Sequence, residues 1–416
     1  MEIDLAVGQS VECTITTVAF GGNGIARLNK RVIFAPFTVD GDRVVVEITA
    51  IKQNYCQAKL KEIVSPSPHR IAPRCPSYSF CGGCQYQHIT YDHQLRIKER
   101  QVTEAFERIG KISTPPVNPI IPSPKEFNYR GKAEVHLSRS GGGSATAGFV
   151  TVDGSAIIAV QQCDLVDEVI NQHYAELRET LGSQPVPLPK RRITIWADRT
   201  IAPSRITKSV KGKVLIVPFE GFFQANTSLV DRLVDCVIDE ARCQPSDTVL
   251  DCYCGCGLFS LFLAPRAKKV IGIEEDRQSS TAARHNLRIQ GHANFRIYQG
   301  RAERVIGTHL IRKGVPIDTV ILDPPRTGCS RRVLSDIMKL GPTRIVYVSC
   351  NPATQARDVS TLLKGNYRLE VLQPFDMFPQ TKHIEVVASL KLEEDKGNEK
   401  RRQKGPRPNL GDREAY

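Results

Sequence analysis

One cysteine of this chain has the surroundings that a nucleophile needs. Cys350 ends the apolar run RIVYVSC and is followed by Asn351 and Pro352, residue types that commonly begin a helix. A thiol at the N-terminus of a helix has a lowered pKa and can act as a thiolate nucleophile. A cysteine that only fills the core is the alternative, but the polar strand ends elsewhere in the sequence favour the reactive role.

Glycines and a carboxylate mark a second segment with chemical potential. The loop DCYCGCGLFS (251–260) carries glycines that let a backbone approach a ligand closely, and a following helix favours an anionic group. Glu274 ends the next apolar run, where a carboxylate can bind two ribose hydroxyls. Because Ser260 stands where a nicotinamide-binding loop has its third glycine, the pattern favours S-adenosylmethionine. A tight turn without a ligand is the alternative.

Four apolar runs of the C-terminal half each end in a polar residue. These runs alternate with helical segments, which predicts a parallel sheet covered on both faces. Ligands of such sheets bind at the carboxyl ends of the strands, so we expect the four residues to meet at one edge. The third run leads into DPPR (323–326), whose prolines stiffen the loop and donate no hydrogen bonds. The four residues are Asp251, Glu274, Asp323 and Cys350.

Another group of cysteines lies in a segment that has little apolar periodicity. Residues 65–90 are rich in Pro, Gly and Cys and contain Cys75, Cys81 and Cys84, and Cys163 follows much later. Four thiolates can hold zinc or an iron–sulfur cluster, and the wide, uneven spacing favours the cluster over unliganded cysteines. The cysteines of the glycine loop alternate, which points neighbours apart and predicts packing roles for Cys252, Cys254 and Cys256.

The segments that must position these residues suggest several domains. Short β runs joined by Gly and Asp turns begin the chain, a helix over 91–109 and a proline-containing linker follow, and a mostly-β region precedes the alternating strands and helices. The chain ends with a β-hairpin and a polar tail that we expect to be disordered. The predicted division is a β-barrel at 1–62, a central domain at 63–90 and 117–218, an α/β domain at 91–116 and 219–392, and a tail at 393–416.

Composition and charge narrow the class of partner. The chain has 416 residues with 57 Lys and Arg against 44 Asp and Glu, a net charge of +13. It has no apolar run long enough to span a membrane and an acidic start unlike a signal peptide, so we expect a cytoplasmic protein with no membrane partner. Residues 190–213 carry eight basic residues and one acidic residue, which indicates either nucleic-acid binding or a solvated surface.

The motifs, taken in order, resemble one family over about residues 5–392: the TRAM-domain RNA 5-methyluridine methyltransferases. The resemblance implies an N-terminal OB-like TRAM barrel, a central mostly-β domain with an iron–sulfur loop, and a C-terminal Rossmann-like class I methyltransferase domain. A departure is Leu258, where the family often carries a polar residue. The matching segments are the spaced cysteines, FFQAN (222–226), DCYCGCG, VIGIE, DPPR, VSCNP and HIE (383–385).

The resemblance also implies roles for individual residues. The activity would be methylation of carbon 5 of a uridine in RNA, with S-adenosylmethionine as the methyl donor. Cys350 would be the nucleophile, and Glu385 would be the base that removes the carbon-5 proton. The methyl donor would contact Gln224, Tyr253, Glu274 and Asp323, and a [4Fe–4S] cluster would be held by Cys75, Cys81, Cys84 and Cys163.

Alternatives remain for the target and for the class of protein. The barrel together with the cluster cysteines resembles members that act on 23S rRNA, and the T-loop uridine of tRNA is the alternative substrate. We expect a monomer that binds RNA through residues 190–213 and Arg130, although an ion pair within the protein would also explain that arginine. A non-catalytic iron–sulfur RNA-binding protein and a cytosine-5 methyltransferase are the other classes. A binding protein would not require Cys350 and Glu385 together.

Overall fold

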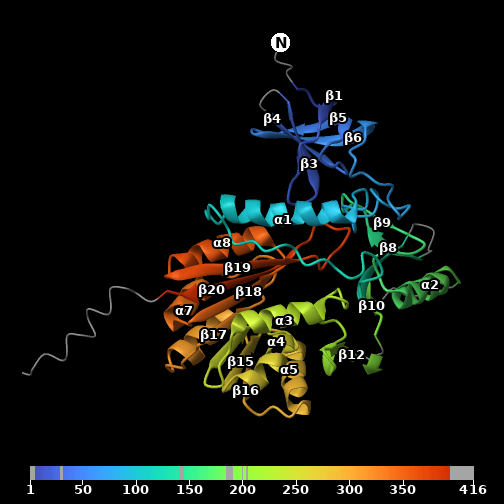
Figure 1. Ribbon diagram of the computed structural model, residues 1–416. Coiled ribbons are helices and arrows are strands. Elements are labelled where there is room, and N and C mark those ends of the chain that lie inside the picture. Colours follow the sequence, from blue (N-terminus) through green and yellow to red (C-terminus); the bar gives the residue numbers. More distant parts are fainter. Residues whose placement is uncertain are drawn as a thin grey trace, which may run out of the picture.

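The structure is a computed structural model that describes residues 5–28, 31–139, 145–183, 191–198, 200–202 and 205–393. All but the first residue of the predicted tail lies outside these ranges. Figure 1 shows the N-terminal strands at one end of the molecule and the large C-terminal sheet at the other, with a long helix between them. Among the described helices, none has the length and apolar character needed to cross a membrane.

The N-terminal region is a six-stranded sheet in the order β1-β5-β6-β4-β3-β2. Alternate residues along its strands are buried, so one face supplies a small core that includes Ile33, Val46 and Ile48. This arrangement agrees with the predicted strand-rich N-terminal domain. The strands are β1 (Ser10–Thr14), β2 (Thr17–Val18), β3 (Asn23–Leu28), β4 (Arg31–Pro36), β5 (Arg43–Ile51) and β6 (Tyr55–Ser65).

The helix α1 (Tyr91–Arg108) connects the two ends of the molecule and matches the predicted helix closely. On one side Gln101 donates hydrogen bonds from Nε2 to the carbonyl oxygens of Val18 and Ala19 in the N-terminal region, at 3.1 and 2.9 Å. On the other side Val102 and Phe106 are buried in the core of the C-terminal sheet. The helix therefore fixes the N-terminal strands relative to that sheet.

The central region is mostly β, as predicted, but it also contains a helix that the prediction did not include. The buried residues Ile170, Tyr174 and Leu181 of this helix have helical spacing and pack under the sheet β10-β7-β8-β9. The pattern was present in the sequence and was overlooked because the neighbouring runs read as strands. The elements are β7 (Lys132–Arg139), β8 (Ala145–Val150), β9 (Ile157–Ile158), α2 (Glu168–Ser183) and β10 (Arg192–Trp196).

A small three-stranded sheet follows, formed by β11 (Thr200–Ala202), β12 (Arg205–Val210) and β13 (Lys213–Pro218). Ile206 and Leu215 share a hydrophobic cluster with the first helix of the C-terminal region. The predicted division assigned these strands to the central domain, whereas β12 and β13 pack against the C-terminal domain.

The C-terminal sheet has seven strands in the order β16-β15-β14-β17-β18-β20-β19. The first five are parallel, and β20 is antiparallel to both of its neighbours, which confirms the predicted parallel sheet and terminal hairpin. Neighbouring residues of the strands, such as Val249 and Leu250, belong to separate cores on opposite faces. The strands are β14 (Thr248–Cys252), β15 (Lys269–Glu274), β16 (Phe295–Gln299), β17 (Thr319–Leu322), β18 (Arg344–Ser349), β19 (Tyr367–Phe375) and β20 (Glu385–Leu392).

Helices cover both faces of this sheet. One face packs against α3 (Val230–Ala241), α4 (Leu258–Leu263) and α5 (Arg277–Ile289). The other face packs against α1, α6 (Ala302–Val305), α7 (Arg331–Leu340) and α8 (Pro352–Leu363). Cys252 lies in one core and Cys254 and Cys256 lie in the other, which confirms that these cysteines pack.

Candidate active site

The four polar strand ends meet at one edge of the C-terminal sheet, as predicted. Glu274 is the last residue of β15, Asp251 lies near the end of β14, and Asp323 and Cys350 follow β17 and β18 directly. Because β15, β14, β17 and β18 are successive neighbours in the sheet, their carboxyl ends form one continuous edge. The topology alone therefore brings together residues that lie about 100 positions apart in the chain.

Cys350 and Glu385 lie next to each other at the ends of the neighbouring strands β18 and β20. Ser349 pairs with Val386 in the antiparallel ladder between β18 and β20. Cys350 follows Ser349 and Glu385 precedes Val386, so these two residues come next in register. Arg326 hydrogen-bonds the Cys350 thiol, and its guanidinium lies 3.5 Å from Nε2 of His383. A thiol, a carboxyl group and a cation thus share one part of the edge.

The titration of Cys350 differs from the sequence-based prediction. Burial of the thiol, followed by the charge of Glu385, raises its pKa to about 11, whereas Arg326 favours the thiolate. Asn351 does cap helix α8, since its Oδ1 accepts a hydrogen bond from the backbone N–H of Ala353 at 3.1 Å. The predicted lowering of the pKa by the helix N-terminus was wrong, because burial outweighs the effect of the helix.

Glu385 is buried, and its carboxyl group holds a proton more tightly than an exposed one would. It is 3% exposed, and burial raises the pKa of its carboxyl group well above the usual value, with the charge of Asp323 acting in the same direction. Burial, followed by the charge of Asp251, raises the pKa of Asp323 to about 7. A general base is most effective when its pKa lies close to the working pH.

The glycine loop packs closely against helix α5. Gly257 has a φ of +86°, and a Cβ at this position would lie 3.2 Å from the Cα of Ala283. The carboxylate of Glu274 accepts hydrogen bonds from the backbone N–H of Gly255 at 2.9 Å and of Asp276 at 2.7 Å. The loop and the carboxylate at the end of β15 are therefore held together as one unit.

Two buried oxygens have no hydrogen-bond partner within the described part of the chain. They are Oδ1 of Asp251, whose other oxygen accepts hydrogen bonds from Ser260, and Oε1 of Gln224, which is 4% exposed. Unpaired acceptors are costly in a buried site, so they fit a ligand that brings hydrogen-bond donors. S-adenosylmethionine has such donors in its ammonium and ribose hydroxyl groups.

Tyr253 lies in the same loop but makes a different contact from the one expected. Its backbone has a φ of +64°, and its hydroxyl group is hydrogen-bonded to the thiol of Cys329, at the end of the loop that begins with Asp323. Its contact with the methyl donor therefore stays a prediction.

The structure brings the four predicted cluster cysteines to one cavity of about 150 Å³. All four are free thiols, and burial raises the pKa of each. Gln87 donates a hydrogen bond from Nε2 to Sγ of Cys84 at 3.2 Å, and its Oε1 accepts one from the backbone N–H of Cys75. Within the described ranges, no group of three or more His, Cys, Asp or Glu side chains is arranged to hold a single metal ion. The cysteines are Cys75, Cys81, Cys84 and Cys163.

The two predicted RNA contacts have structural partners. Arg130 lines the cysteine cavity and donates a hydrogen bond from Nε to the carbonyl oxygen of Lys132. In the basic segment 190–213, Lys208 is 3% exposed and pairs with Asp198, and Lys211 pairs with Asp235. Lys190 and Arg199 lie outside the described residues. Lys208 and Lys211 therefore form ion pairs within the protein.

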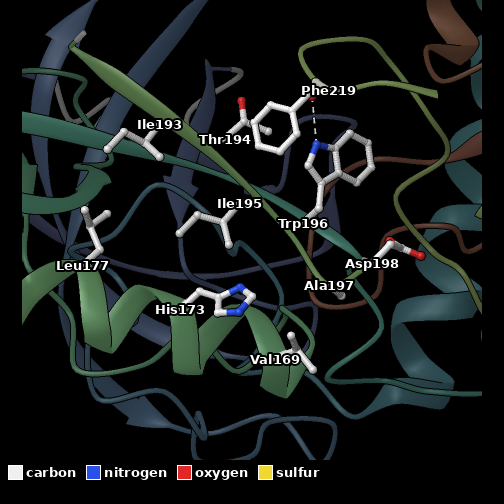
Figure 2. A pocket seen from close by; sticks show the side chains of 10 residues that line it. All are labelled: Val169, His173, Leu177, Ile193, Thr194, Ile195, Trp196, Ala197, Asp198 and Phe219. Atoms are coloured by element: carbon white, nitrogen blue, oxygen red, sulfur yellow. Dashed lines mark hydrogen bonds between the residues drawn. The ribbon is translucent and has the colours of Figure 1, made fainter. Parts of the chain in front are cut away.

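A larger cavity of about 480 Å³ lies between α2 and β10 and contains none of the predicted site residues (Figure 2). Its walls are formed by side chains such as His173 and Leu177 of α2 and Ile195 of β10. Trp196 closes one end, and its indole N–H donates a hydrogen bond to the carbonyl oxygen of Phe219 at 2.8 Å.

Two further residues, Arg326 and His383, lie at the edge that contains Cys350 and Glu385 and were not predicted as site residues. Arg326 was named only as the end of DPPR, and His383 only as the start of HIE, and neither was given a role. Burial and the nearby cations lower the pKa of His383 to about 3, so this imidazole is neutral. The signal that could have found both was their position, since each lies within three residues of a predicted site residue.

Comparisons with known proteins agree with this architecture. Residues 205–393 match the model of the tRNA (uracil-5-)-methyltransferase family, and residues 4–61 match that of the TRAM domain. An uncharacterized RNA methyltransferase of Halalkalibacterium halodurans is 33% identical over 92% of this chain and 97% of its own length. Another from Gloeobacter violaceus is 34% identical over 93% of this chain and 97% of its own length.

A solved structure shows the same fold. It is a tRNA (uracil-54, C5)-methyltransferase of Pyrococcus abyssi in complex with S-adenosyl-L-homocysteine, with a TM-score of 0.70 and 23% identity. The match covers 91% of this chain and all of that chain. These similarities confirm the resemblance found in the sequence, and the chain belongs to the S-adenosylmethionine-dependent RNA uracil-5-methyltransferase family with an N-terminal TRAM domain.

Proposed function

We propose that this chain methylates carbon 5 of one uridine in 23S rRNA through a covalent bond between Cys350 and carbon 6 of the base. The observation that carries the proposal is that Cys350 and Glu385 lie beside each other just beyond the Ser349–Val386 pair of the β18–β20 ladder, close to Arg326. A protein that only binds RNA has no need of a buried carboxyl group next to a thiol. We further propose that it acts as a monomer in the cytoplasm.

Uracil chemistry explains why both side chains are needed. Carbon 5 is a poor nucleophile until the sulfur of Cys350 adds to carbon 6 and the electrons of the C5–C6 double bond move towards the carbonyl oxygen at carbon 4. Carbon 5 would then attack the sulfonium methyl group of S-adenosylmethionine, and the bond between sulfur and that methyl group would break to leave S-adenosylhomocysteine. Arg326 favours the thiolate required for the first step, because its charge and hydrogen bond act on the sulfur of Cys350.

The last step requires a base. Glu385 takes the proton from carbon 5, the electrons of that C–H bond restore the C5–C6 double bond, and the C6–S bond breaks to release the thiolate of Cys350. The raised pKa of Glu385 suits it to accept this proton. The target base must leave its stack to reach this buried edge, which costs a few kcal/mol and least in a single-stranded loop.

The residues proposed to hold the methyl donor are Gln224, Tyr253, Glu274 and Asp323. The unpaired oxygen of Gln224 and the fixed carboxylate of Glu274 support this assignment. Glu274 would accept hydrogen bonds from ribose hydroxyl groups, and the glycine loop would leave room for the rest of the ligand.

We also propose that the four cysteines hold a [4Fe–4S] cluster with a structural role. Thiolates are the usual ligands of such clusters, and the N–H of Gln87 and the charge of Arg130 would stabilise the negative charge on the sulfur atoms. Anaerobically purified protein should contain iron and acid-labile sulfide. Absence of both after reconstitution would refute the cluster.

The rRNA target is tested by direct competition between substrates. Purified enzyme is incubated with tritiated S-adenosylmethionine and unmodified transcripts of 23S rRNA domains and tRNAs, and 5-methyluridine is mapped by mass spectrometry. We expect one modified uridine in a 23S rRNA fragment. Modification of a T-loop uridine alone would support the tRNA alternative, which the similarity to the Pyrococcus tRNA enzyme favours. The product 5-methylcytidine would refute uridine specificity.

A further inference from the structure

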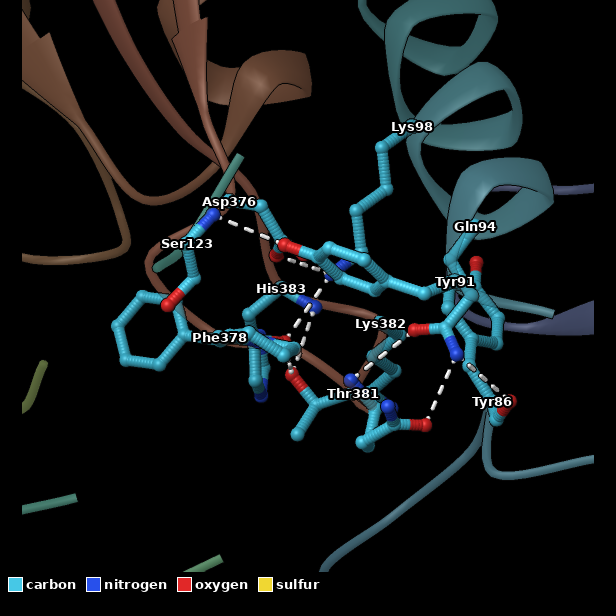
Figure 3. Close-up of polar contacts among 12 residues, drawn as sticks. Tyr86, Tyr91, Gln94, Lys98, Ser123, Asp376, Phe378, Thr381, Lys382 and His383 are labelled. Atoms are coloured by element: carbon cyan, nitrogen blue, oxygen red, sulfur yellow. Dashed lines mark hydrogen bonds and ion pairs between the residues drawn. The ribbon is translucent and has the colours of Figure 1, made fainter. Parts of the chain in front are cut away.

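We propose that Lys98 is a positioning residue for the release step, because it fixes the loop that delivers Glu385 to Cys350. The inference rests on the function proposed above, in which Glu385 removes the carbon-5 proton. The loop covers residues 376–384 and connects β19 to β20. Figure 3 shows Lys98 and Gln94 on α1, facing this loop.

The hydrogen bonds of the Lys98 ammonium group are made with the start of the loop, and the same group lies over the ring of Tyr86. The ammonium group of Lys98 lies 2.6 Å from Oδ1 of Asp376, and the side chains of both residues are completely buried. The same ammonium group donates a hydrogen bond to the carbonyl oxygen of Phe378 at 3.0 Å. A buried ion pair is costly to desolvate and is weak evidence for stability, so its presence here calls for a role in specifying one arrangement.

A second set of contacts holds the middle of the loop. Gln94 and Gln380 form a reciprocal pair: Nε2 of Gln94 donates to Oε1 of Gln380 at 2.8 Å, and the backbone N–H of Gln380 donates to Oε1 of Gln94 at 3.0 Å. The carbonyl oxygen of Gln380 accepts hydrogen bonds from the backbone N–H groups of Gln85 and Tyr86. Helix α1 and the segment after Cys84 therefore both hydrogen-bond to Gln380 in the middle of the loop.

The position of Asp376 explains how contacts with the loop can affect the position of Glu385. Phe375 pairs with Glu385 in the β19–β20 ladder, so Asp376 leaves the sheet directly beside the base. Fixing Asp376 and Phe378 fixes the point at which the chain leaves β19 and returns into β20. Cys350 directly follows β18 and lies outside this loop. Loss of Lys98 should therefore displace the base and leave the nucleophile in place.

This separation predicts a specific kinetic signature. Carbon–sulfur bond formation and methyl transfer precede the proton removal, so a misplaced Glu385 delays release of Cys350 from the methylated base. Lys98→Met should lower kcat about 10- to 100-fold and leave KM for S-adenosylmethionine within about twofold. With natural uridine in the RNA, the fraction of enzyme bound as a denaturant-resistant adduct should rise at least about tenfold.

Two further variants separate positioning from general stability. Lys98→Met/Asp376→Leu removes both charges and is expected to recover the melting temperature lost in the single variant, because no unpaired buried charge remains. It should still accumulate the adduct, since the hydrogen bond to Phe378 is absent. Arg344→Met breaks another mostly buried ion pair, with Glu370, at the opposite end of β18. This matched control should lose stability without accumulating the adduct.

The possible results distinguish the inference from the function on which it rests. If wild-type enzyme methylates uridine but Lys98→Met and the double variant show no excess adduct, the positioning role is wrong and the proposed function stands. Excess adduct in Arg344→Met would also overturn the positioning role. If the wild-type enzyme forms no methylated uridine and no adduct with RNA containing 5-fluorouridine, the proposed function itself fails.

Discussion

The edge of the C-terminal sheet that contains Asp323, Cys350 and Glu385, here called the catalytic edge, and the cavity lined by the four predicted cluster cysteines differ in what holds their residues in place. The catalytic edge lies on a seven-stranded sheet between two large hydrophobic cores, so strand order fixes where Cys350 and Asp323 lie. The cysteine cavity lies in a loop region whose cysteines are held by hydrogen bonds such as those of Gln87. We therefore expect the catalytic edge to keep its structure when its reactive side chain is removed. The cysteine cavity should depend for its structure on the cysteines that line it.

The largest effect is expected at the catalytic edge. Cys350→Ala should lower methylation by roughly 10⁴-fold or more, because it removes the thiol that adds to carbon 6 of the base. Its melting temperature should stay near the wild-type value, since the side chain is only partly buried. The matched control is Cys56→Ala, which removes a thiol buried in the core of the N-terminal sheet and should lower stability while retaining activity. Activity in Cys350→Ala would refute the nucleophile.

The binding of the methyl donor should respond less strongly than catalysis. Glu274→Gln removes a charged acceptor, and we expect the affinity for S-adenosylmethionine to fall about 10- to 100-fold, from the strength of hydrogen bonds to charged groups. Isothermal titration calorimetry measures this directly. Glu275→Gln, at an exposed neighbouring position, is the control and should bind as the wild type does. Equal affinities in all three proteins would contradict the assigned ribose contact.

The cysteine cavity should show the converse pattern. Cys84→Ser should abolish binding of iron and lower the melting temperature by about 5 to 10 °C, because loss of a metal centre removes several kcal/mol. The affinity for S-adenosylmethionine should remain unchanged. Iron analysis and thermal unfolding of the anaerobic protein test this, with Cys243→Ser as a control that lies away from the cavity. Full iron content in Cys84→Ser would contradict the ligand assignment.

The smallest effect concerns the pKa of Cys350. Burial raises this pKa to about 11, so the thiolate fraction, and with it the rate of alkylation by iodoacetamide, should rise about tenfold per pH unit from pH 7 to 9. Arg326→Met removes a cation that favours the thiolate, so it should raise the pKa and slow alkylation at pH 8.5 several-fold. A rate independent of pH in this range would indicate a thiolate already formed at neutral pH.

The same contrast explains what could be predicted from the sequence. Apolar runs that end in polar residues are typical of parallel strands, so the edge containing Glu274, Asp323 and Cys350 followed from periodicity and topology. The titration of Cys350 did not follow, because its pKa depends on burial by segments that lie far away in the sequence. Lys98 looked like an ordinary residue of an amphipathic helix, and only the fold shows that it faces Asp376.

The sequence predicted that the four cysteines lie together, but not which other residues surround them. The spacing of Cys75, Cys81 and Cys84 indicated a shared ligand, and the structure does place Cys163 at the same cavity. Arg130 was expected to contact RNA, and its place in the wall of this cavity could not be inferred without the fold. Helix α2 was missed because its helical spacing was surrounded by runs with strand-like composition.

The covalent adduct gives the most direct test of the central claim. Purified enzyme is incubated with S-adenosylmethionine and 23S rRNA transcripts in which uridine is replaced by 5-fluorouridine. Because fluorine at carbon 5 cannot leave as a proton, the last step stalls with the protein attached to RNA. The account predicts a denaturant-resistant adduct whose only linked residue is Cys350, and none with Cys350→Ala. An adduct at another residue, or none despite bound methyl donor, would contradict it.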